Sequence, residues 1–250
     1  MAIPESDYLE AFKTAGSHLQ ACMDRSDASF GWLKMRPSKP AFADLVFVSG
    51  QRMYAVLLAA MTSQKQESGG SRASFEIPRE QRELLLQECE RYRLEPLVFP
   101  LWLGIMQPLT TGWNLFSLKT MEPVTPGDEA DEPPVLMSEW ELSNFCVSLV
   151  AQELEEKGLR LYACQDLPNI YPHIWFTDEE DRRAWAAVLP AFGAEPTRIP
   201  EEVKELRHKL PAGVAGYIAR MGVCSAERPG ALPMRGESMT VSYNGLEKLP

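Results

Sequence analysis

A stretch rich in proline and acidic residues interrupts the hydrophobic pattern near the middle of the chain, and it constrains the fold more than any other feature. It spans residues 121–135, and its prolines and clustered acidic residues are Pro123, Pro126, Asp128, Glu129, Asp131, Glu132, Pro133 and Pro134. Because proline has no backbone N–H and like charges repel, we expect neither helix nor sheet here. The sequence therefore predicts two units, residues 1–120 and 138–250, joined by an exposed linker over residues 121–137.

The composition predicts a packed, acidic protein. Hydrophobic residues make up 45% and charged residues 24% of the 250 residues, which is typical of globular chains. The net charge of −10 and the pI near 5.0 argue against a general nucleic-acid binder, since neutralising phosphates needs a basic surface. They favour a protein partner, and a charge of this size can steer the chain toward a basic one. The sequence does not indicate the oligomeric state.

Targeting signals are not evident in the sequence. No apolar run approaches the roughly 20 residues that a membrane helix needs, and the first residues lack the basic and apolar regions of a signal peptide. We therefore expect a cytoplasmic protein without a membrane span. The five cysteines, Cys22, Cys89, Cys146, Cys164 and Cys224, are scattered among apolar residues, which favours reduced core thiols over disulfides or a zinc site.

The first half shows an α+β pattern. Apolar spacing predicts a helix over residues 8–23, and residues 43–48 and 53–61 read as an antiparallel strand pair whose second strand is buried on both faces. A helix with Pro78 as its first residue should run to about residue 93, followed by strands over residues 97–103 and 113–118. Residues 63–72 should form an exposed loop. The expected order is helix, strand, strand, helix, strand.

The second half predicts a smaller α+β unit. Ser138 and Glu141 have the spacing of a capping box, and the helix that follows should end at Gly158. Residues 159–163 and 173–176 should pair as strands. Residues 177–188 fit either a helix or an acidic hairpin turn leading into a strand, and we favour the hairpin slightly. A helix over residues 200–210 and strands over residues 216–220 and 238–243 should complete the unit.

Residues 42–59 carry a possible functional motif. Asp44 opens one strand, a turn follows, and the next strand contains Leu57, Leu58 and Ala59. This layout resembles the PD-(D/E)XK (restriction-endonuclease-like) superfamily, in which an Asp opens a strand and a Glu-x-Lys or Asp-x-Lys ends the next. The resemblance covers residues 8–118 and implies a nuclease-like αββαβ unit. Asp44 corresponds to the first carboxylate of the motif.

The departure from that motif predicts an inactive site. In the superfamily two carboxylates hold a divalent metal and the lysine helps to activate water, whereas aliphatic side chains at the positions of Leu57 and Ala59 can do neither. The resemblance therefore implies no metal and no cofactor, unless Glu10 or Lys65 has moved into the site, in which case a Mg²⁺-dependent nuclease is the alternative. On its own, Asp44 fits a plain strand-entry residue slightly better than a nuclease carboxylate.

The remaining candidate residues do not form a recognisable catalytic or metal-binding motif. His18, His173 and His208 lack metal-ligand spacing, and the acidic run 178–181 is typical of a solvated turn. Trp175 and Trp185 are candidate binding residues, because tryptophan is enriched at interface hot spots. We therefore predict a non-catalytic binding or regulatory protein, with a nuclease of rearranged active site or an unrelated enzyme as the alternatives.

Overall fold

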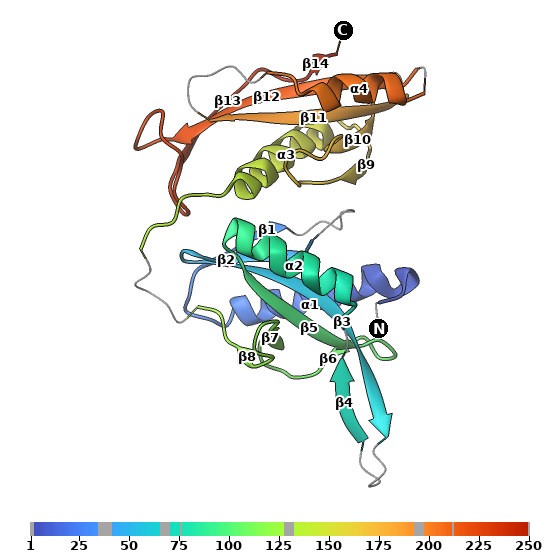
Figure 1. The fold of residues 1–250 in the computed structure, drawn as a ribbon, viewed down its shortest axis with the longest axis vertical. Coiled ribbons are helices and arrows are strands. Elements are labelled where there is room, and N and C mark those ends of the chain that lie inside the picture. Colours follow the sequence, from blue (N-terminus) through green and yellow to red (C-terminus); the bar gives the residue numbers. More distant parts are fainter. Residues whose placement is uncertain are drawn as a thin grey trace. The chain divides into compact units, whose positions relative to one another are not determined.

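The computed structural model describes residues 3–34, 42–65, 71–75, 77–127, 133–192, 198–211 and 213–249. These residues divide into two compact units, one up to Pro133 and one from Pro134 onward. Within the described residues there are four helices and two mixed sheets, so the predicted α+β class is confirmed (Figure 1). No described helix is long and apolar enough to cross a membrane.

The first unit is built around one mixed sheet. Its elements are α1 (Glu5–Met23), β1 (Phe30–Lys34), β2 (Leu45–Ser49), β3 (Arg52–Lys65), β4 (Ser71–Phe75), α2 (Arg79–Tyr92), β5 (Glu95–Trp102), β6 (Gln107–Pro108), β7 (Leu115–Ser117) and β8 (Pro123–Val124). The strand order is β1-β2-β3-β5-β7-β8, with β4 paired to β3 and β6 to β5. Among the described strands of this first unit, only the β3–β5 pair is parallel.

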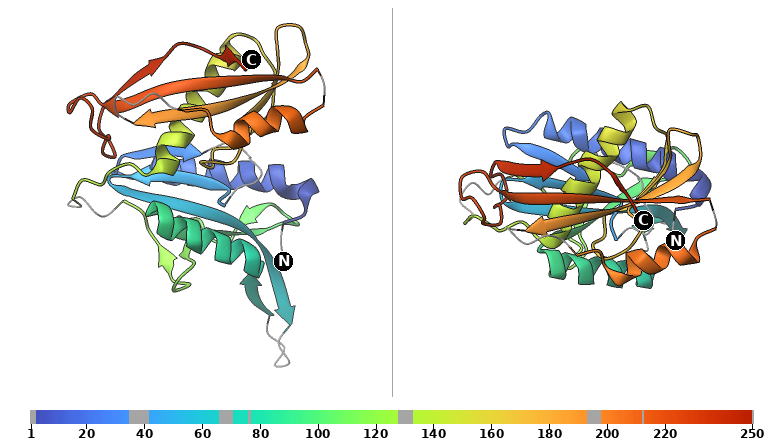
Figure 2. Two further views of the ribbon diagram at one scale, coloured as in Figure 1. Left: turned by 45° about the horizontal axis from the view of Figure 1, so that its top comes forward. Right: turned by 90° about the horizontal axis from the view of Figure 1, so that it is seen from above.

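The apolar run in β3 explains its central position. Its side chains from Met53 to Met61 are all buried, as predicted for a strand covered on both faces. Alternate residues Tyr54, Val56 and Leu58 pack with α1 in one hydrophobic cluster. Helix α2 lies on the opposite face of the sheet (Figure 2).

Four sequence predictions for the first unit need correction. Strand β1 was not expected, and the predicted loop over residues 63–72 is partly strand, because Lys65 of β3 pairs with Ser71 of β4; residues 66–70 lie outside the described residues. Helix α2 begins one residue later than expected, with Pro78 preceding it.

In the predicted linker, Pro123 and Val124 form β8, which pairs with β7. Proline fits there because β8 is an edge strand, where one N–H needs no partner. The acidic residues Asp128–Glu132 lie outside the described residues.

The second unit combines a mixed sheet with two helices. Its elements are α3 (Glu139–Glu156), β9 (Leu161–Cys164), β10 (Ile174–Thr177), β11 (Arg183–Phe192), α4 (Glu201–Lys209), β12 (Ala215–Ser225), β13 (Met239–Tyr243) and β14 (Glu247–Lys248). The strand order is β13-β12-β11-β10-β9, and β14 also pairs with β12. β11 and β12 are parallel, and α4 lies in the connection between them. α3 packs on one face of the sheet, and Val203 of α4 packs on the other.

Two local predictions for this unit are confirmed. The capping box is present, since the Glu141 N–H donates to Ser138 Oγ at 3.3 Å and the Ser138 N–H donates to Glu141 Oε2 at 2.6 Å. The hairpin between β10 and β11 is also present, with Thr177 opposite Arg183. Helix α3 ends at Glu156, and Gly158 follows two residues later. The φ of Gly158 is 77°, a left-handed conformation that glycine adopts without strain.

A buried ion pair ties the start of α3 to the connection between β12 and β13. The Arg235 guanidinium donates to both carboxylate oxygens of Glu141, at 2.9 and 3.1 Å, and the two side chains are 5% and 3% exposed. Backbone hydrogen bonds from Arg235 N to Val135 O and from Met137 N to Pro233 O run beside it. The capping glutamate therefore also holds a distant loop.

Candidate functional site

The carboxylate of Asp44, the first residue suggested by the sequence, lies at the entry to β2. Its Oδ1 accepts a hydrogen bond from the Tyr8 hydroxyl at 2.7 Å, and its Oδ2 accepts one from the Leu58 N–H at 2.7 Å. The Asp44 N–H donates to Val56 O at 2.9 Å. These bonds join the start of β2 to α1 and β3, so both oxygens of Asp44 are used within the fold.

The surroundings of Asp44 oppose its ionisation. Burial raises the pKa of Asp44, although the Leu58 N–H, the Tyr8 hydroxyl and the charge of Lys34 each act to lower it. Burial and the neighbouring Asp44 carboxylate also raise the pKa of Tyr8. Lys34, at the end of β1, is 4% exposed, and its Nζ lies 5.8 Å from the centre of the Phe42 ring. Burial therefore favours the protonated forms of both the Asp44 carboxyl and the Tyr8 phenol.

This arrangement differs from a metal centre. The described residues hold no group of three or more His, Cys, Asp or Glu side chains placed to bind a metal ion. Glu10 is exposed on α1, and Lys65 lies at the far end of β3, where its side chain is not described. The lysine whose charge acts on Asp44 is Lys34, which was not among the candidates from the sequence. The only sign of Lys34 in the sequence is that it is the single charged residue at the end of the mostly apolar strand β1.

The two tryptophans proposed as a binding surface lie opposite each other on β10 and β11. Trp185 is fully buried and Trp175 half-buried, and both pack with Val203 beneath α4. The predicted aromatic surface is therefore wrong for Trp185, because α4 covers that face of the sheet. Gly216 lies beside Trp185 on β12, and a Cβ there would come within 2.6 Å of the indole. A glycine is needed to make room for the ring.

The acidic run after β10 forms the solvated turn that we expected, except that its first residue, Asp178, is buried. Asp178 is only 7% exposed and accepts hydrogen bonds from the backbone N–H groups of Glu180 and Arg182, at 3.0 and 2.9 Å. The Arg182 guanidinium also donates to Asp178 Oδ2, at 3.1 and 2.9 Å. Burial opposes ionisation of Asp178, but these donors, the Arg182 N–H first, together lower its pKa. Asp178 organises the turn, while Glu179 and Glu180 are exposed.

The other sequence candidates are structural or exposed. His18 makes a 2.6 Å hydrogen bond with the Gly112 carbonyl, and His208 is exposed on α4. All five cysteines are free; Cys22, Cys89 and Cys146 are buried, whereas Cys164 and Cys224 are half-buried. Burial raises the pKa of Cys89 and of Cys146 to about 12, so neither is poised as a nucleophile.

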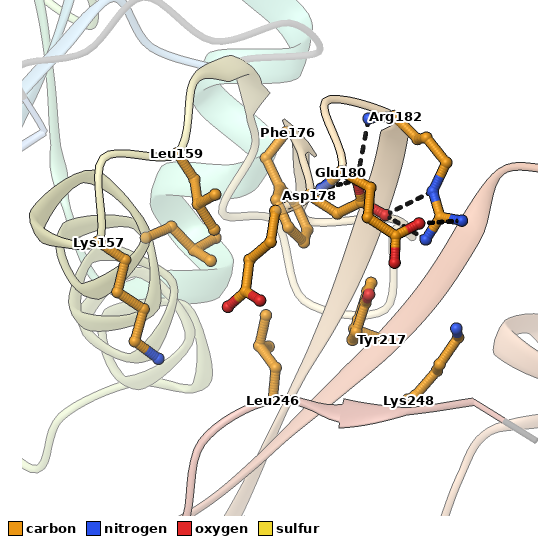
Figure 3. A pocket seen from close by; sticks show the side chains of 11 residues that line it. Lys157, Leu159, Phe176, Asp178, Glu180, Arg182, Tyr217, Leu246 and Lys248 are labelled. Carbon is orange, nitrogen blue, oxygen red and sulfur yellow. Dashed lines mark hydrogen bonds and ion pairs between the residues drawn. The ribbon is translucent and has the colours of Figure 1, made fainter.

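A pocket of about 310 Å³ lies in the second unit beside the turn between β10 and β11 (Figure 3). We call it the turn pocket. Its lining residues are Leu154, Lys157, Leu159, Phe176, Asp178, Glu179, Glu180, Arg182, Tyr217, Leu246 and Lys248. The aliphatic and aromatic side chains come from α3, β10, β12 and the C-terminal segment, and charged side chains surround them. The turn pocket thus has apolar walls and a charged rim.

The rim of the turn pocket carries paired and unpaired charges. Arg182 bonds to Asp178 and Glu180, and Lys157 bonds to Glu153 at 2.5 Å. Across the described part of the chain, Glu179 and Lys248 make no ion pair. One carboxylate and one ammonium group are therefore available to a ligand. Burial, and then the charge of Asp178, raise the pKa of Tyr217, so its hydroxyl stays protonated.

Comparison with known proteins identifies one related family. Residues 140–249 match the family described as "Domain of unknown function (DUF8840)". No curated protein and no solved structure matches the chain. The DUF8840 match covers less than half of the chain, and it contains every residue that lines the turn pocket. It begins at Trp140, within the first turn of α3, so the capping residue Ser138 precedes it.

Proposed function

We propose that this chain is a non-catalytic binding protein in which a degenerate nuclease-like unit is joined to a DUF8840 unit that contacts a protein partner. The observation that carries the first part is the state of Asp44. Both of its oxygens accept hydrogen bonds from within the fold, and the adjoining strand presents Leu57, Leu58 and Ala59. A magnesium site needs ionised oxygens that remain free to bind the cation.

The topology supports the nuclease-like part of the proposal. After α1, the strands β2 and β3 form an antiparallel pair, α2 follows, and β5 returns parallel to β3. Asp44 immediately precedes β2, as the first carboxylate does in the family that the sequence resembles. Strand β1, β4 and the short strands β6–β8 are additions to that order.

The turn pocket supports the binding part. Its volume is near the lower end of the range for ligand pockets, about 300–1,000 Å³, and suits one or two side chains of a partner. The apolar walls favour an aliphatic or aromatic anchor, and Glu179 favours a basic neighbour of that anchor. The chain's net charge of −10 favours a basic partner as well. We therefore propose a partner segment with an apolar residue next to lysine or arginine.

The partner can be tested by charge reversal at the rim of the turn pocket. Immobilised wild-type protein, Glu179→Lys and Leu246→Ala would be compared for partner capture, with Glu227→Lys as a matched control because Glu227 is exposed and outside the pocket. We expect a partner that is retained by the wild type and the control and lost from both pocket variants. Equal capture by all four proteins would overturn the assignment of the turn pocket.

A nuclease with a rearranged site is the second candidate, and the position of Lys34 favours it. Lys34 places a positive charge near a lone carboxylate, a combination that resembles part of a nuclease site. Calorimetric titration with Mg²⁺ and Mn²⁺, together with cleavage assays on DNA and RNA, separates the two functions. We expect no cleavage and the same metal titration for the wild type and Asp44→Asn. Cleavage or tight metal binding that Asp44→Asn abolishes would establish the nuclease instead.

A further inference from the structure

A second cavity of about 170 Å³ lies in the DUF8840 unit, separate from the turn pocket. We call it the His173 cavity. It is bounded by the first turns of α3, the loop between β9 and β10, β11 and the residue before α4, and its lining residues are Glu139, Ser143, Pro168, Asn169, Tyr171, His173, Val188, Leu189, Pro190 and Pro200. Its volume equals the space of roughly five or six water molecules.

The protonation of His173 is fixed by the fold. The ring is 2% exposed, and the Val188 N–H donates to its Nδ1 at 3.0 Å, so the proton of the neutral ring is on Nε2. Burial lowers the pKa of His173 to about 4, although the Leu167 carbonyl favours the charged ring. At neutral pH the cavity therefore contains a neutral imidazole that can act only as a donor at Nε2.

The Leu167 carbonyl lies near enough to act on the charge of the ring but does not reach Nε2 within hydrogen-bond distance in the described part of the fold. Nε2 of His173 is buried and has no hydrogen-bond partner there. Buried donors are nearly always paired, because leaving one without an acceptor is unfavourable. An acceptor atom from a ligand would satisfy it.

The walls of the His173 cavity are held by hydrogen bonds rather than by packing alone. Gln165 is buried, its side-chain amide donates to the Ile170 carbonyl, and its side-chain oxygen accepts from Leu167 N at 3.0 Å. Its backbone N–H donates to the His173 carbonyl at 2.8 Å. The loop that forms one wall is thus built around a single buried glutamine, and the cavity is a preformed feature.

Helix α3 contributes hydrogen-bond acceptors to the lining of the cavity. Glu139 and Ser143 lie four residues apart on α3 and so share one face of the helix. Glu139 is exposed and accepts a hydrogen bond from the Asn169 amide at 3.3 Å, and Ser143 is 3% exposed. A ligand here meets the Nε2 donor of His173, the carboxylate of Glu139, the hydroxyl of Ser143, and apolar walls from Val188 and the prolines.

We propose that the His173 cavity binds a neutral primary carboxamide. The amide oxygen accepts from His173 Nε2, and the amide nitrogen donates toward Ser143 and Glu139. A carboxylate of the same size would face the Glu139 charge without gaining a cation, and an ammonium group would offer His173 no acceptor. A free small amide and the side chain of an asparagine or glutamine both satisfy this chemistry. The inference does not depend on the proposed function, which concerns the turn pocket and Asp44.

The test uses benzamide as the probe and the full chain as the protein. Titration would follow the imidazole ¹H and ¹⁵N signals of His173, with exposed His208 as an internal reference. We expect a saturable shift at His173 with millimolar affinity, which is reasonable for so small a ligand. Benzoate should bind at least tenfold more weakly, and His208 should not respond. No saturable shift at His173, or equal binding of the amide and the acid, would overturn the proposal.

Substitutions in the lining of the His173 cavity test the proposal independently of the wild-type titration. Ser143→Leu should fill the cavity and abolish the benzamide shift, whereas Ser148→Leu on the exposed side of α3 should bind as the wild type does. Glu139→Gln keeps a folded surface residue and should bring benzoate closer to benzamide in affinity, which tests the cavity even if Ser143→Leu fails to fold. Unchanged benzamide binding in a folded Ser143→Leu, or an unchanged ratio in Glu139→Gln, would contradict the assignment. A glutamine-containing peptide then distinguishes a side-chain ligand from a free amide.

Discussion

Two carboxylates, one in each unit, receive hydrogen bonds from several donors but have pKa values shifted in opposite directions. Asp44 in the first unit accepts from Tyr8 and from the Leu58 N–H. Glu237 in the second unit accepts from the Ser225 hydroxyl, from Met234 N at 2.6 Å and from Arg228. Burial raises the pKa of Asp44, whereas the Arg228 guanidinium, followed by the Ser225 hydroxyl and the Met234 N–H, lowers the pKa of Glu237 to about 2.

The two carboxylates differ in burial, which has the largest effect on the pKa of Asp44 and a smaller one on that of Glu237, and in whether a cation is bonded to them. Glu237 is bonded directly to a guanidinium and is ionised in the fold, whereas Lys34 acts on Asp44 only as a nearby charge. A carboxyl group whose ionisation is opposed by burial, and whose two oxygens already accept hydrogen bonds, is a poor ligand for Mg²⁺. The comparison therefore links the electrostatics of Asp44 to the proposal that the first unit is not catalytic.

The largest expected loss of stability comes from placing a carboxylate at a buried position that has neither a neutral hydrogen-bond donor nor a cation to bind it. Leu57 is 7% exposed in the central strand β3, one residue before the N–H that binds Asp44. Leu57→Asp should cost more than about 4 kcal/mol of unfolding free energy and leave little folded protein. Leu84→Asp, at a position on α2 that is 42% exposed, is the control and should melt close to the wild type. Similar thermal melting of both variants would show that β3 is not covered on both faces.

A smaller but still large effect is expected where a buried cation loses its carboxylate. Glu141→Gln retains the capping box, since glutamine also serves at that position, but it removes the charge that pairs with buried Arg235. Breaking such a pair costs about 3–5 kcal/mol. Urea unfolding measures the change, and Glu139→Gln, on the exposed side of the same turn, should shift stability by less than about 0.5 kcal/mol. A loss below about 1 kcal/mol would mean that the Glu141–Arg235 pair adds little to the fold.

Removing one neutral donor should have a moderate effect. Tyr8→Phe deletes the hydroxyl that donates to Asp44 at 2.7 Å and should cost about 1–2 kcal/mol. Tyr162→Phe is a matched control, because the Tyr162 ring is 47% exposed and its hydroxyl contacts Arg160 in solvent. If urea unfolding gives the same stability for Tyr8→Phe as for this control, the Tyr8–Asp44 bond does not stabilise the first unit.

Local pattern was sufficient to predict some elements and not others. The continuous apolar run of β3 and the capping box at Ser138 were readable because each signal lies within a few residues. Strand β8 was not predictable in this way, since an edge strand of two residues has no periodicity. Neither was the burial of Trp185, which depends on α4 packing over it. The partners of the key carboxylates are remote, with Tyr8 36 residues from Asp44 and Arg235 94 residues from Glu141. Such pairs are set by tertiary packing, and a single sequence does not reveal them.

The smallest expected effect is a difference in the sign of two pH dependences. The pKa of Asp44 is raised in the fold above its ordinary value of 3.8, so its contribution to stability is fully present below that value and is lost as pH rises through the folded pKa. The pKa of Glu237 falls from 4.5 to about 2, so its contribution is present above 4.5 and is lost as pH falls through the folded value. Urea unfolding of the wild type, Asp44→Asn and Glu237→Gln across the acidic range would measure both. We expect the stability of the wild type relative to Asp44→Asn to fall with rising pH, and that relative to Glu237→Gln to rise. If the two differences change in the same direction, Asp44 is ionised like Glu237, and the proposal that its carboxyl serves only as a structural acceptor is wrong.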